Sequence, residues 1–148
     1  MNTSEVIARA LALVERSRSV LVGSVDGDGY PNIKGMFNLK HDGLRTFLFS
    51  TNTSSKRVSQ FVENPQACLY FVDLERIEGL QLTGKMEALQ DPELKQLLWF
   101  DGCEKYYPLG VTDPDYTVLR FTAERGNYYH RLVKVDFDCD TTEGPLQP

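Results

Sequence analysis

The spacing of hydrophobic residues divides the chain into one amphipathic helix at its start and a long series of strand-like segments. Over residues 4–16 the apolar positions recur every three or four residues, which predicts a helix with Thr3 or Ser4 as its N-cap. Farther along, short alternating or β-branched apolar segments predict strands. These strand-like segments cover residues 19–25, 30–39, 44–51, 66–73, 79–89, 116–126 and 127–137.

Turn residues separate these segments at short intervals. DGDG at 26–29 is typical of a tight hairpin turn, and HDG at 41–43 predicts a second turn. Gly84 predicts a β-bulge inside its strand, and the last two strands are predicted to form a hairpin that turns after Gly126. Strands joined by such local turns favour a mainly β, α+β fold, an antiparallel barrel with peripheral helices.

Helical spacing returns twice between the strands. Residues 54–63 predict a short helix that an Asn-Pro pair ends. Residues 92–101 predict another, with Asp91 as N-cap and Pro92 as the first helical residue. Both helices follow a strand directly, so we expect them to pack against the outside of the barrel.

Length and charge narrow the class of protein. A chain of 148 residues argues for a single domain, which we expect to span residues 1–138 and to be followed by a flexible tail at 139–148. The net charge of −5 argues against a nucleic-acid-binding protein, because such proteins are usually basic. No apolar run approaches the roughly 18 residues of a transmembrane helix. Three widely spaced cysteines are typical of free thiols in a reducing compartment. We therefore predict a cytoplasmic protein that binds neither nucleic acid nor membrane.

No group of residues has the spacing of a metal site. A calcium loop beginning at DGDG would need an oxygen ligand, a glycine and a glutamate where the chain has Tyr30, Pro31 and Phe37. His41 and His130 have no partner at zinc-site spacing. We predict no bound metal. The common nucleophile and phosphate-loop motifs are also missing from the sequence, so the catalytic residues stay unknown.

The stretch STNTSSKR at residues 50–57 is the strongest chemical signal. Small hydroxyl and amide side chains run from Ser50 to Ser55, and two basic residues follow where the second helix begins. The N-terminus of a helix offers free N–H groups and partial positive charge, so it attracts anions. Arginine can also bind phosphate with two parallel hydrogen bonds. The alternative, an N-cap followed by two solvated basic residues, accounts for one serine but not for the whole run.

Three segments, GYPNIKGMF, FLFSTNTSSKRVSQFVENPQACLYF and WFDGCEKYYPLGVTDPDYTVLRFTAERGNYY, together resemble the FMN-binding split-barrel family typified by pyridoxamine 5′-phosphate oxidase. The third segment is similar to the general-stress-protein branch. The resemblance covers about residues 19–130. It implies a six-stranded antiparallel split barrel, a homodimer, and FMN bound in two clefts at the dimer interface.

The resemblance also implies a set of cofactor-binding residues. Lys56 and Arg57 match the basic pair that holds the FMN phosphate, Ser55 is the serine of the same motif, and Ser50 and Thr51 match the strand end beside it. The strand under the flavin contributes Lys34, Met36 and Asn38, and Lys34 would donate to the pyrimidine edge of the ring. Aromatic residues would cover the ring, from candidates that include Trp99, Tyr106, Tyr107 and Tyr129.

The chain departs from the oxidases at two places. Gly79 falls where they have a glutamine near the flavin, and His130-Arg131 is all that matches their C-terminal substrate motif. We therefore expect FMN, but not oxidation of pyridoxamine phosphate. The first hypothesis is a flavin-dependent oxidoreductase acting on an unidentified small substrate. The alternatives are a flavin-binding or stress-response protein without turnover, and a related pocket that holds haem or a deazaflavin.

Overall fold

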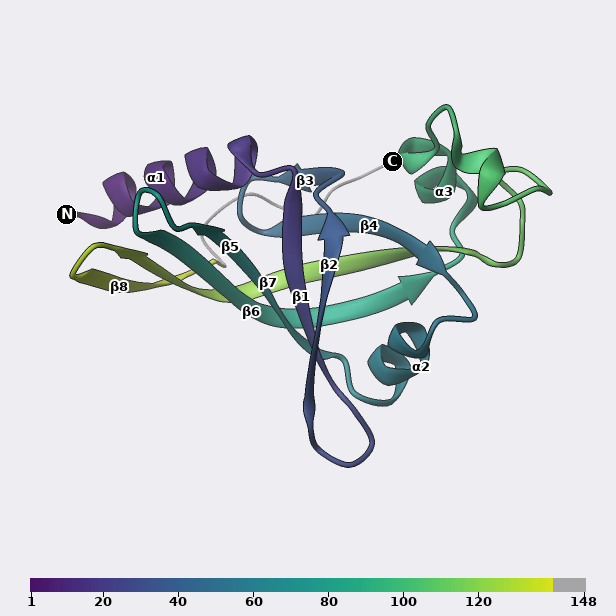
Figure 1. Ribbon diagram of the computed structural model, residues 1–148, viewed down its shortest axis with the longest axis horizontal. Helices are drawn as coiled ribbons and strands as arrows, with labels where there is room; N and C mark the ends of the chain where they lie inside the picture. The colour runs from purple at the N-terminus through teal and green to yellow at the C-terminus, as the bar shows by residue number, and fades with distance from the viewer. Residues whose placement is uncertain (140–148) are drawn as a thin grey trace.

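The computed structural model describes residues 1–139, which form one antiparallel sheet flanked by helices (Figure 1). The elements are α1 (Thr3–Arg16), β1 (Ser19–Val25), β2 (Pro31–Phe37), β3 (Lys40–Asp42), β4 (Thr46–Asn52), α2 (Lys56–Glu63), β5 (Gln66–Asp73), β6 (Glu78–Leu89), α3 (Pro92–Leu98), a 3₁₀ turn (Cys103–Lys105), β7 (Tyr116–His130) and β8 (Val133–Asp138). The strand order is β2-β1-β5-β6-β7-β4-β3, with β8 paired to β7.

The sheet is a half-barrel that stays open, because its edge strands β2 and β3 do not pair with each other in the described part of the chain. This architecture confirms the predicted antiparallel split barrel with peripheral helices. The predicted number of six strands is wrong, since residues 1–139 form eight. One extra strand comes from the predicted turn at 41–43, where His41 pairs with Phe47 and Asp42 with Thr46 before the chain turns at Gly43.

The predicted hairpin at Gly126 is also wrong. β7 continues through this glycine to His130, and the chain turns at Arg131, whose φ is 58°. A Cβ atom at Gly126 would lie 2.3 Å from the Phe137 ring of β8. The glycine therefore makes room for a close side chain rather than for a turn.

Of two further predictions, the β-bulge at Gly84 is confirmed and the end of the third helix is wrong. The bulge at Gly84 is confirmed, because the β6–β7 register shifts between Thr83 and Gly84, where a Cβ atom would lie 2.0 Å from the Thr122 carbonyl oxygen. The third helix, predicted to reach residue 101, ends at Leu98. Trp99 instead adopts an extended backbone and stacks edge-on against Tyr116 at a ring distance of 5.4 Å.

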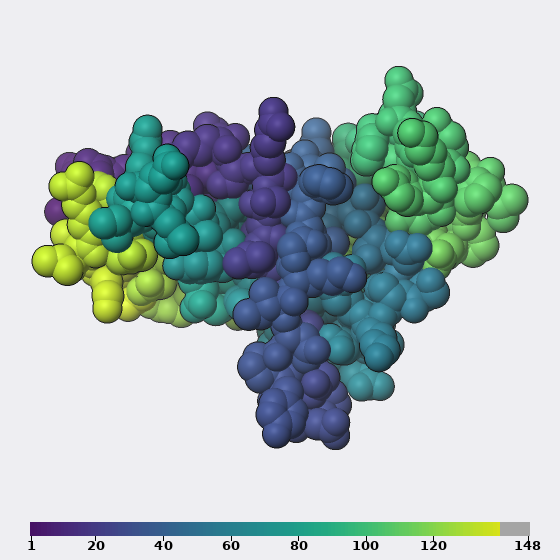
Figure 2. All heavy atoms as spheres, in the orientation of Figure 1, coloured from purple at the N-terminus to yellow at the C-terminus, as the bar shows by residue number. Residues whose placement is uncertain are grey.

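The helices occupy two ends of the sheet and leave β2 uncovered. In Figure 1, α1 lies along one end, whereas α2 and α3 lie at the other. Figure 2 shows the β1–β2 hairpin crossing the front of the molecule and projecting beyond its body. Among residues 1–139, none of the helices has the length and apolarity needed to cross a bilayer. Cys139 is buried and donates its N–H to the Glu124 carbonyl, and residues 140–148 of the predicted tail lie outside the described residues.

The core fixes where α2 begins. Val58 and Phe61 of α2 are buried against the sheet, and they belong to the same apolar cluster as Val22 of β1. These contacts hold the first turn of α2 beside β1 and β2. The same turn carries Lys56 and Arg57, which therefore lie beside β1 and β2.

Candidate functional site

A pocket of about 330 Å³ lies between the start of α2 and the β1–β2 hairpin. It is lined by Val22, Ser24, Asn32, Ile33, Lys34, Ser55, Lys56, Arg57 and Gln60. Three of these residues are cations and, within residues 1–139, no carboxylate lines the pocket. We call it the anion pocket, because a site with several positive charges and no negative one attracts anions.

Two buried donors in the anion pocket have no hydrogen-bond partner in the described part of the chain. These are the Ser55 hydroxyl and Nη1 of Arg57. Ser55 occupies the N-cap position of α2 without accepting a bond from the helix, and the guanidinium makes one long contact, from Nη2 to Oγ1 of Thr51 at 3.5 Å. Burial lowers the pKa of Arg57, because desolvation disfavours its charged form. An unpaired buried donor costs about 1–3 kcal/mol, so a bound anion would relieve this cost.

A second, more apolar pocket of about 510 Å³ adjoins the first. It is lined by Gly35, Met36, Phe37, Leu39, Ser50, Thr51, Asn52, Arg57, Phe100, Cys103, Tyr106 and Tyr107. Arg57 lines both pockets, and β2 runs from Lys34 in the anion pocket to Met36 in the apolar pocket. The pair of pockets therefore fits a ligand with an anionic end and a broad apolar end.

Half of the hydroxyl-rich stretch has a structural role that the sequence did not reveal. The middle residues of the stretch bond to the loop before β7: Nδ2 of Asn52 and the N–H of Ser54 donate to the Asp115 carboxylate, and the Thr53 hydroxyl donates to the Pro114 carbonyl. Hydrogen bonds to the Asp115 carboxylate hold its pKa below the ordinary value, and the bond from the Ser54 N–H has the largest effect. Ser50, Thr51 and Asn52 line the apolar pocket, and Ser55 lines the anion pocket.

Three other residues predicted for the site lie elsewhere in this chain. The Asn38 amide donates to the carbonyls of Val14 and Ser17 at the end of α1. Trp99 packs in the aromatic cluster beside β7 and lines neither pocket. Tyr129 pairs with Gly79, near the far end of β7. Contact of Trp99 or Tyr129 with a cofactor across a subunit boundary stays a prediction.

Sequence reasoning missed residues that the fold brings into the pockets. Gln60 lies three and four positions after Arg57 and Lys56, so helical spacing could have placed it on their face. Asn32 lies two positions before Lys34, on the same side of β2. No local signal indicated Phe100 or Cys103, because a long segment folds back to bring them beside β4.

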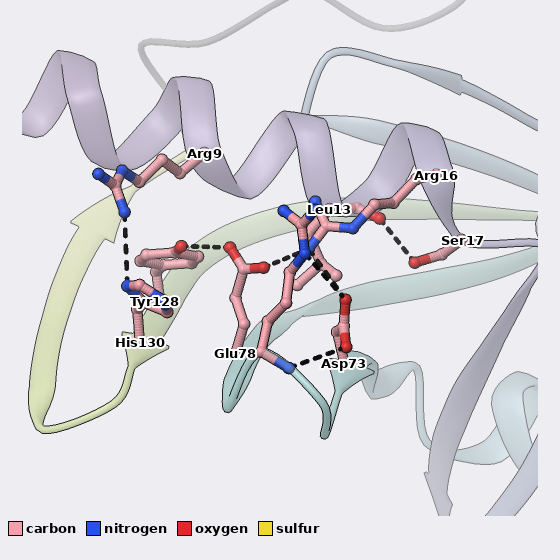
Figure 3. Close-up of polar contacts among 9 residues, drawn as sticks. Arg9, Leu13, Arg16, Ser17, Asp73, Glu78, Tyr128 and His130 are labelled. Carbon is pink, nitrogen blue, oxygen red and sulfur yellow. Dashed lines mark hydrogen bonds and ion pairs between the residues drawn. The ribbon is translucent and has the colours of Figure 1, made fainter.

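A second polar cluster lies at the opposite end of the sheet, under α1 (Figure 3). The buried Glu78 carboxylate accepts from Arg16 with one oxygen and from the Tyr128 hydroxyl with the other. Arg16 also reaches Asp73 at 3.4 Å. Burial, with the Glu78 contact, raises the pKa of Tyr128 to about 12. The Glu78 carboxylate has both oxygens bound, so this cluster holds α1 onto the sheet.

Fold and pockets together define a class: an open antiparallel split barrel with an anion pocket where its second helix begins. The family model described as pyridoxamine 5′-phosphate oxidase matches residues 7–130. The chain belongs to this family.

Individual relatives agree with this assignment. A crystal structure from Clostridium acetobutylicum, of a protein related to general stress protein 26 of Bacillus subtilis in the pyridoxine phosphate oxidase family, is 50% identical. It superposes with a TM-score of 0.84 over 94% of this chain and 98% of that one. A haem-binding protein from Mycobacterium smegmatis shares the fold at 13% identity, with a TM-score of 0.71 over 93% of this chain and 59% of its own.

A curated relative is more distant. Pyridoxine/pyridoxamine 5′-phosphate oxidase from Trichormus variabilis is 29% identical over 82 residues, which are 55% of this chain and 38% of the relative. The chain thus matches well under half the length of that enzyme.

Proposed function

We propose that the two adjoining pockets bind FMN and that the protein is a flavin-dependent oxidoreductase acting on an unidentified small substrate. The observation that carries this proposal is Arg57, which lines both pockets and keeps a buried N–H that has no partner within residues 1–139. A phosphate would bond to that N–H at one side, while a planar ring would occupy the apolar pocket at the other.

The phosphate end would be held by cations and a hydroxyl. Lys34, Lys56 and Arg57 supply the charges, and Ser55 supplies a donor that has no partner among the described residues. Each charge-assisted bond contributes roughly 1.5–3 kcal/mol, toward the lower end for the exposed lysines. Because Lys34 shares a pocket with the other two cations, we assign it to the phosphate rather than to the pyrimidine edge of the ring.

The ring end would rest among apolar and hydroxyl side chains. Met36 lies on β2, Ser50 and Thr51 at the end of β4, and Tyr106 and Tyr107 on the segment before β7. FMN, when bound, supplies hydride and single-electron transfer. The residues of this chain orient it and keep water from part of its surface.

Homodimerisation belongs to the same proposal. The outer face of β2, β1 and β5 exposes a row of apolar side chains, with Ile33 exposed by 72% and Phe37 by 74%, and Leu21 lies in the same row. Exposed apolar surface of this kind is typical of an interface. A partner on this face would extend the apolar pocket, which Phe37 lines, and could bring Trp99 or Tyr129 toward the ring.

The residues that resembled a substrate motif have structural contacts here. Nδ1 of His130 lies 3.4 Å from Arg9, and Arg131 forms the β7–β8 turn with its N–H bonded to the Ile77 carbonyl. This arrangement supports a substrate other than pyridoxamine phosphate.

A second candidate is haem. The haem-binding relative from Mycobacterium smegmatis has this fold. The apolar pocket also contains Cys103, Tyr106 and Tyr107, and thiolate and phenolate are both known axial ligands of haem iron. The buried, unpaired donors of the anion pocket favour a phosphate ligand over this candidate.

The absorbance spectrum of the freshly purified protein, followed by release and identification of the chromophore, tests the proposal. We expect flavin absorption that dithionite bleaches and air restores, and FMN in the released fraction. Reduction by NADH or NADPH would support turnover, and failure of every reductant would favour a flavin-binding protein without activity. A Soret band would favour haem. Colourless protein that does not bind added FMN would overturn both the oxidoreductase and the flavin-binding protein without activity.

A further inference from the structure

The anion pocket also contains a hydrogen bond between two uncharged side chains, Ser24 and Gln60. The Ser24 hydroxyl donates to Oε1 of Gln60 at 2.6 Å. Ser24 is 5% exposed, and both residues line the pocket, Ser24 from β1 and Gln60 from α2. The contact is thus a partly buried polar link between the sheet and the helix, placed beside the positive charges.

In the structure the Ser24 hydroxyl bonds the oxygen end of the Gln60 amide. A glutamine side chain has one acceptor oxygen and an NH₂ group with two donors. Because Ser24 occupies the oxygen, the NH₂ group is the end left for a ligand. Helical spacing puts Gln60 on the face of α2 that carries Lys56 and Arg57.

The polar side chains around Gln60 make the pocket rich in donors. Ser55 and Arg57 contribute donors that are unpartnered in the described part of the chain, and the lysine side chains of Lys34 and Lys56 have donors alone. If the amide were reversed, its oxygen would face the oxygens of a bound anion and repel them. With the Ser24 hydroxyl bonded to its oxygen, the Gln60 amide therefore offers donors to a bound anion.

We propose that Ser24 and Gln60 form a positioning pair that turns the amide donors toward the ligand and thereby selects a dianionic phosphate monoester over an uncharged ligand. This inference rests on the proposed function, because FMN and riboflavin differ in that phosphate alone. Three cations and added neutral donors match a group with two charges and three free oxygens better than they match a carboxylate.

The test compares FMN and riboflavin affinities, by quenching of flavin fluorescence, in four variants. We expect Gln60→Glu to weaken FMN binding about 30-fold, because a negative charge replaces a donor. We expect Ser24→Ala and Gln60→Ala each to weaken it about fivefold, with the double variant no weaker than about tenfold. Riboflavin affinity should change less than about twofold throughout. Gln96→Glu, an exposed glutamine on α3, is the control for the same charge change.

Inorganic phosphate provides a second measurement that does not need a flavin. It should raise the melting temperature of the wild type and of Gln96→Glu, but not of Gln60→Glu. Equal loss of FMN and riboflavin affinity, or equal phosphate stabilisation in all variants, would overturn the positioning pair. If the wild type binds no flavin yet responds to phosphate as expected, the proposed function fails while the selection of phosphate stands.

Discussion

The two polar clusters, one at each end of the sheet, differ in how well their buried groups are paired. Under α1, the Glu78 carboxylate has both oxygens bound, by Arg16 and by Tyr128. At the start of α2, the Ser55 hydroxyl and Nη1 of Arg57 are buried without partners in the described part of the chain. The Glu78 carboxylate is therefore fully bonded, whereas the anion pocket keeps two buried donors that have no partner within residues 1–139.

This difference separates stability from function. A buried network with every bond made holds elements together, whereas unpaired buried donors destabilise the free protein by about 1–3 kcal/mol each. Where such donors line a pocket, as those of Ser55 and Arg57 do, a bound ligand can supply the missing acceptors. The comparison therefore predicts that changes under α1 alter the free energy of unfolding and that changes at α2 alter ligand affinity.

The largest effect is expected from Lys56→Ala combined with Arg57→Ala. Loss of two charge-assisted bonds should weaken FMN binding by about 4 kcal/mol, close to 1,000-fold. The free energy of unfolding without ligand should stay the same or rise, because a buried unpaired donor is removed. Titration of FMN into the apoprotein and urea unfolding measure the two quantities.

Lys40→Ala with Lys134→Ala removes the same charge from exposed positions and is the control for this experiment. It should leave FMN affinity within about twofold of the wild type. Unchanged FMN affinity in the pocket variant would refute the assignment of the phosphate site.

Replacement of Arg16 should have the converse effect. Arg16→Met leaves the Glu78 carboxylate, which is 6% exposed, without its cation. We expect the free energy of unfolding to fall by about 3 kcal/mol, because a buried charge loses its partner. FMN affinity of the folded fraction should not change. A variant as stable as the wild type would contradict the comparison. So would a folded variant whose FMN affinity is lower than that of the wild type.

Tyr128→Phe tests the other oxygen of Glu78 and should cost about 1–2 kcal/mol at neutral pH. Its effect depends on pH, because folding raises the pKa of Tyr128 from its ordinary value near 10 to about 12. The stabilisation from the protonated phenol is complete below the lower value and is lost as pH rises through the higher one. The stability difference between wild type and variant should therefore shrink from pH 9 to pH 12, as followed by urea unfolding at each pH.

The periodic parts of the fold were predictable from the sequence. Apolar spacing located α1, most strands and the start of α2, because burial on one face imposes those patterns. Gly126 misled the prediction, since a glycine that makes room for the Phe137 ring has the same local signal as one that makes a turn. The end of α3 depended on packing of Trp99 against Tyr116, which is a tertiary contact.

The site was predictable only where its residues are contiguous. Lys56 and Arg57 are neighbours at the start of a helix that the sequence predicts, so the sequence could indicate them. Ser24 and Gln60 are 36 positions apart and meet only in the folded chain. The polar run before α2 combined two roles that composition cannot separate. Asn52 and Ser54 bond to Asp115, while the Ser55 hydroxyl has no partner among the described residues.

The smallest expected effect concerns Asn38, which the sequence assigned to the cofactor and the fold places with α1. Its amide donates to the Val14 and Ser17 carbonyls at 2.9 and 3.0 Å. Asn38→Ala should lower the free energy of unfolding by about 1 kcal/mol, because two helix-end carbonyls lose a donor. FMN affinity should be unchanged, since Asn38 lines neither pocket. A tenfold or greater loss of FMN affinity at wild-type stability would instead assign Asn38 to the ligand site, and the two ends of the sheet would then no longer differ in role.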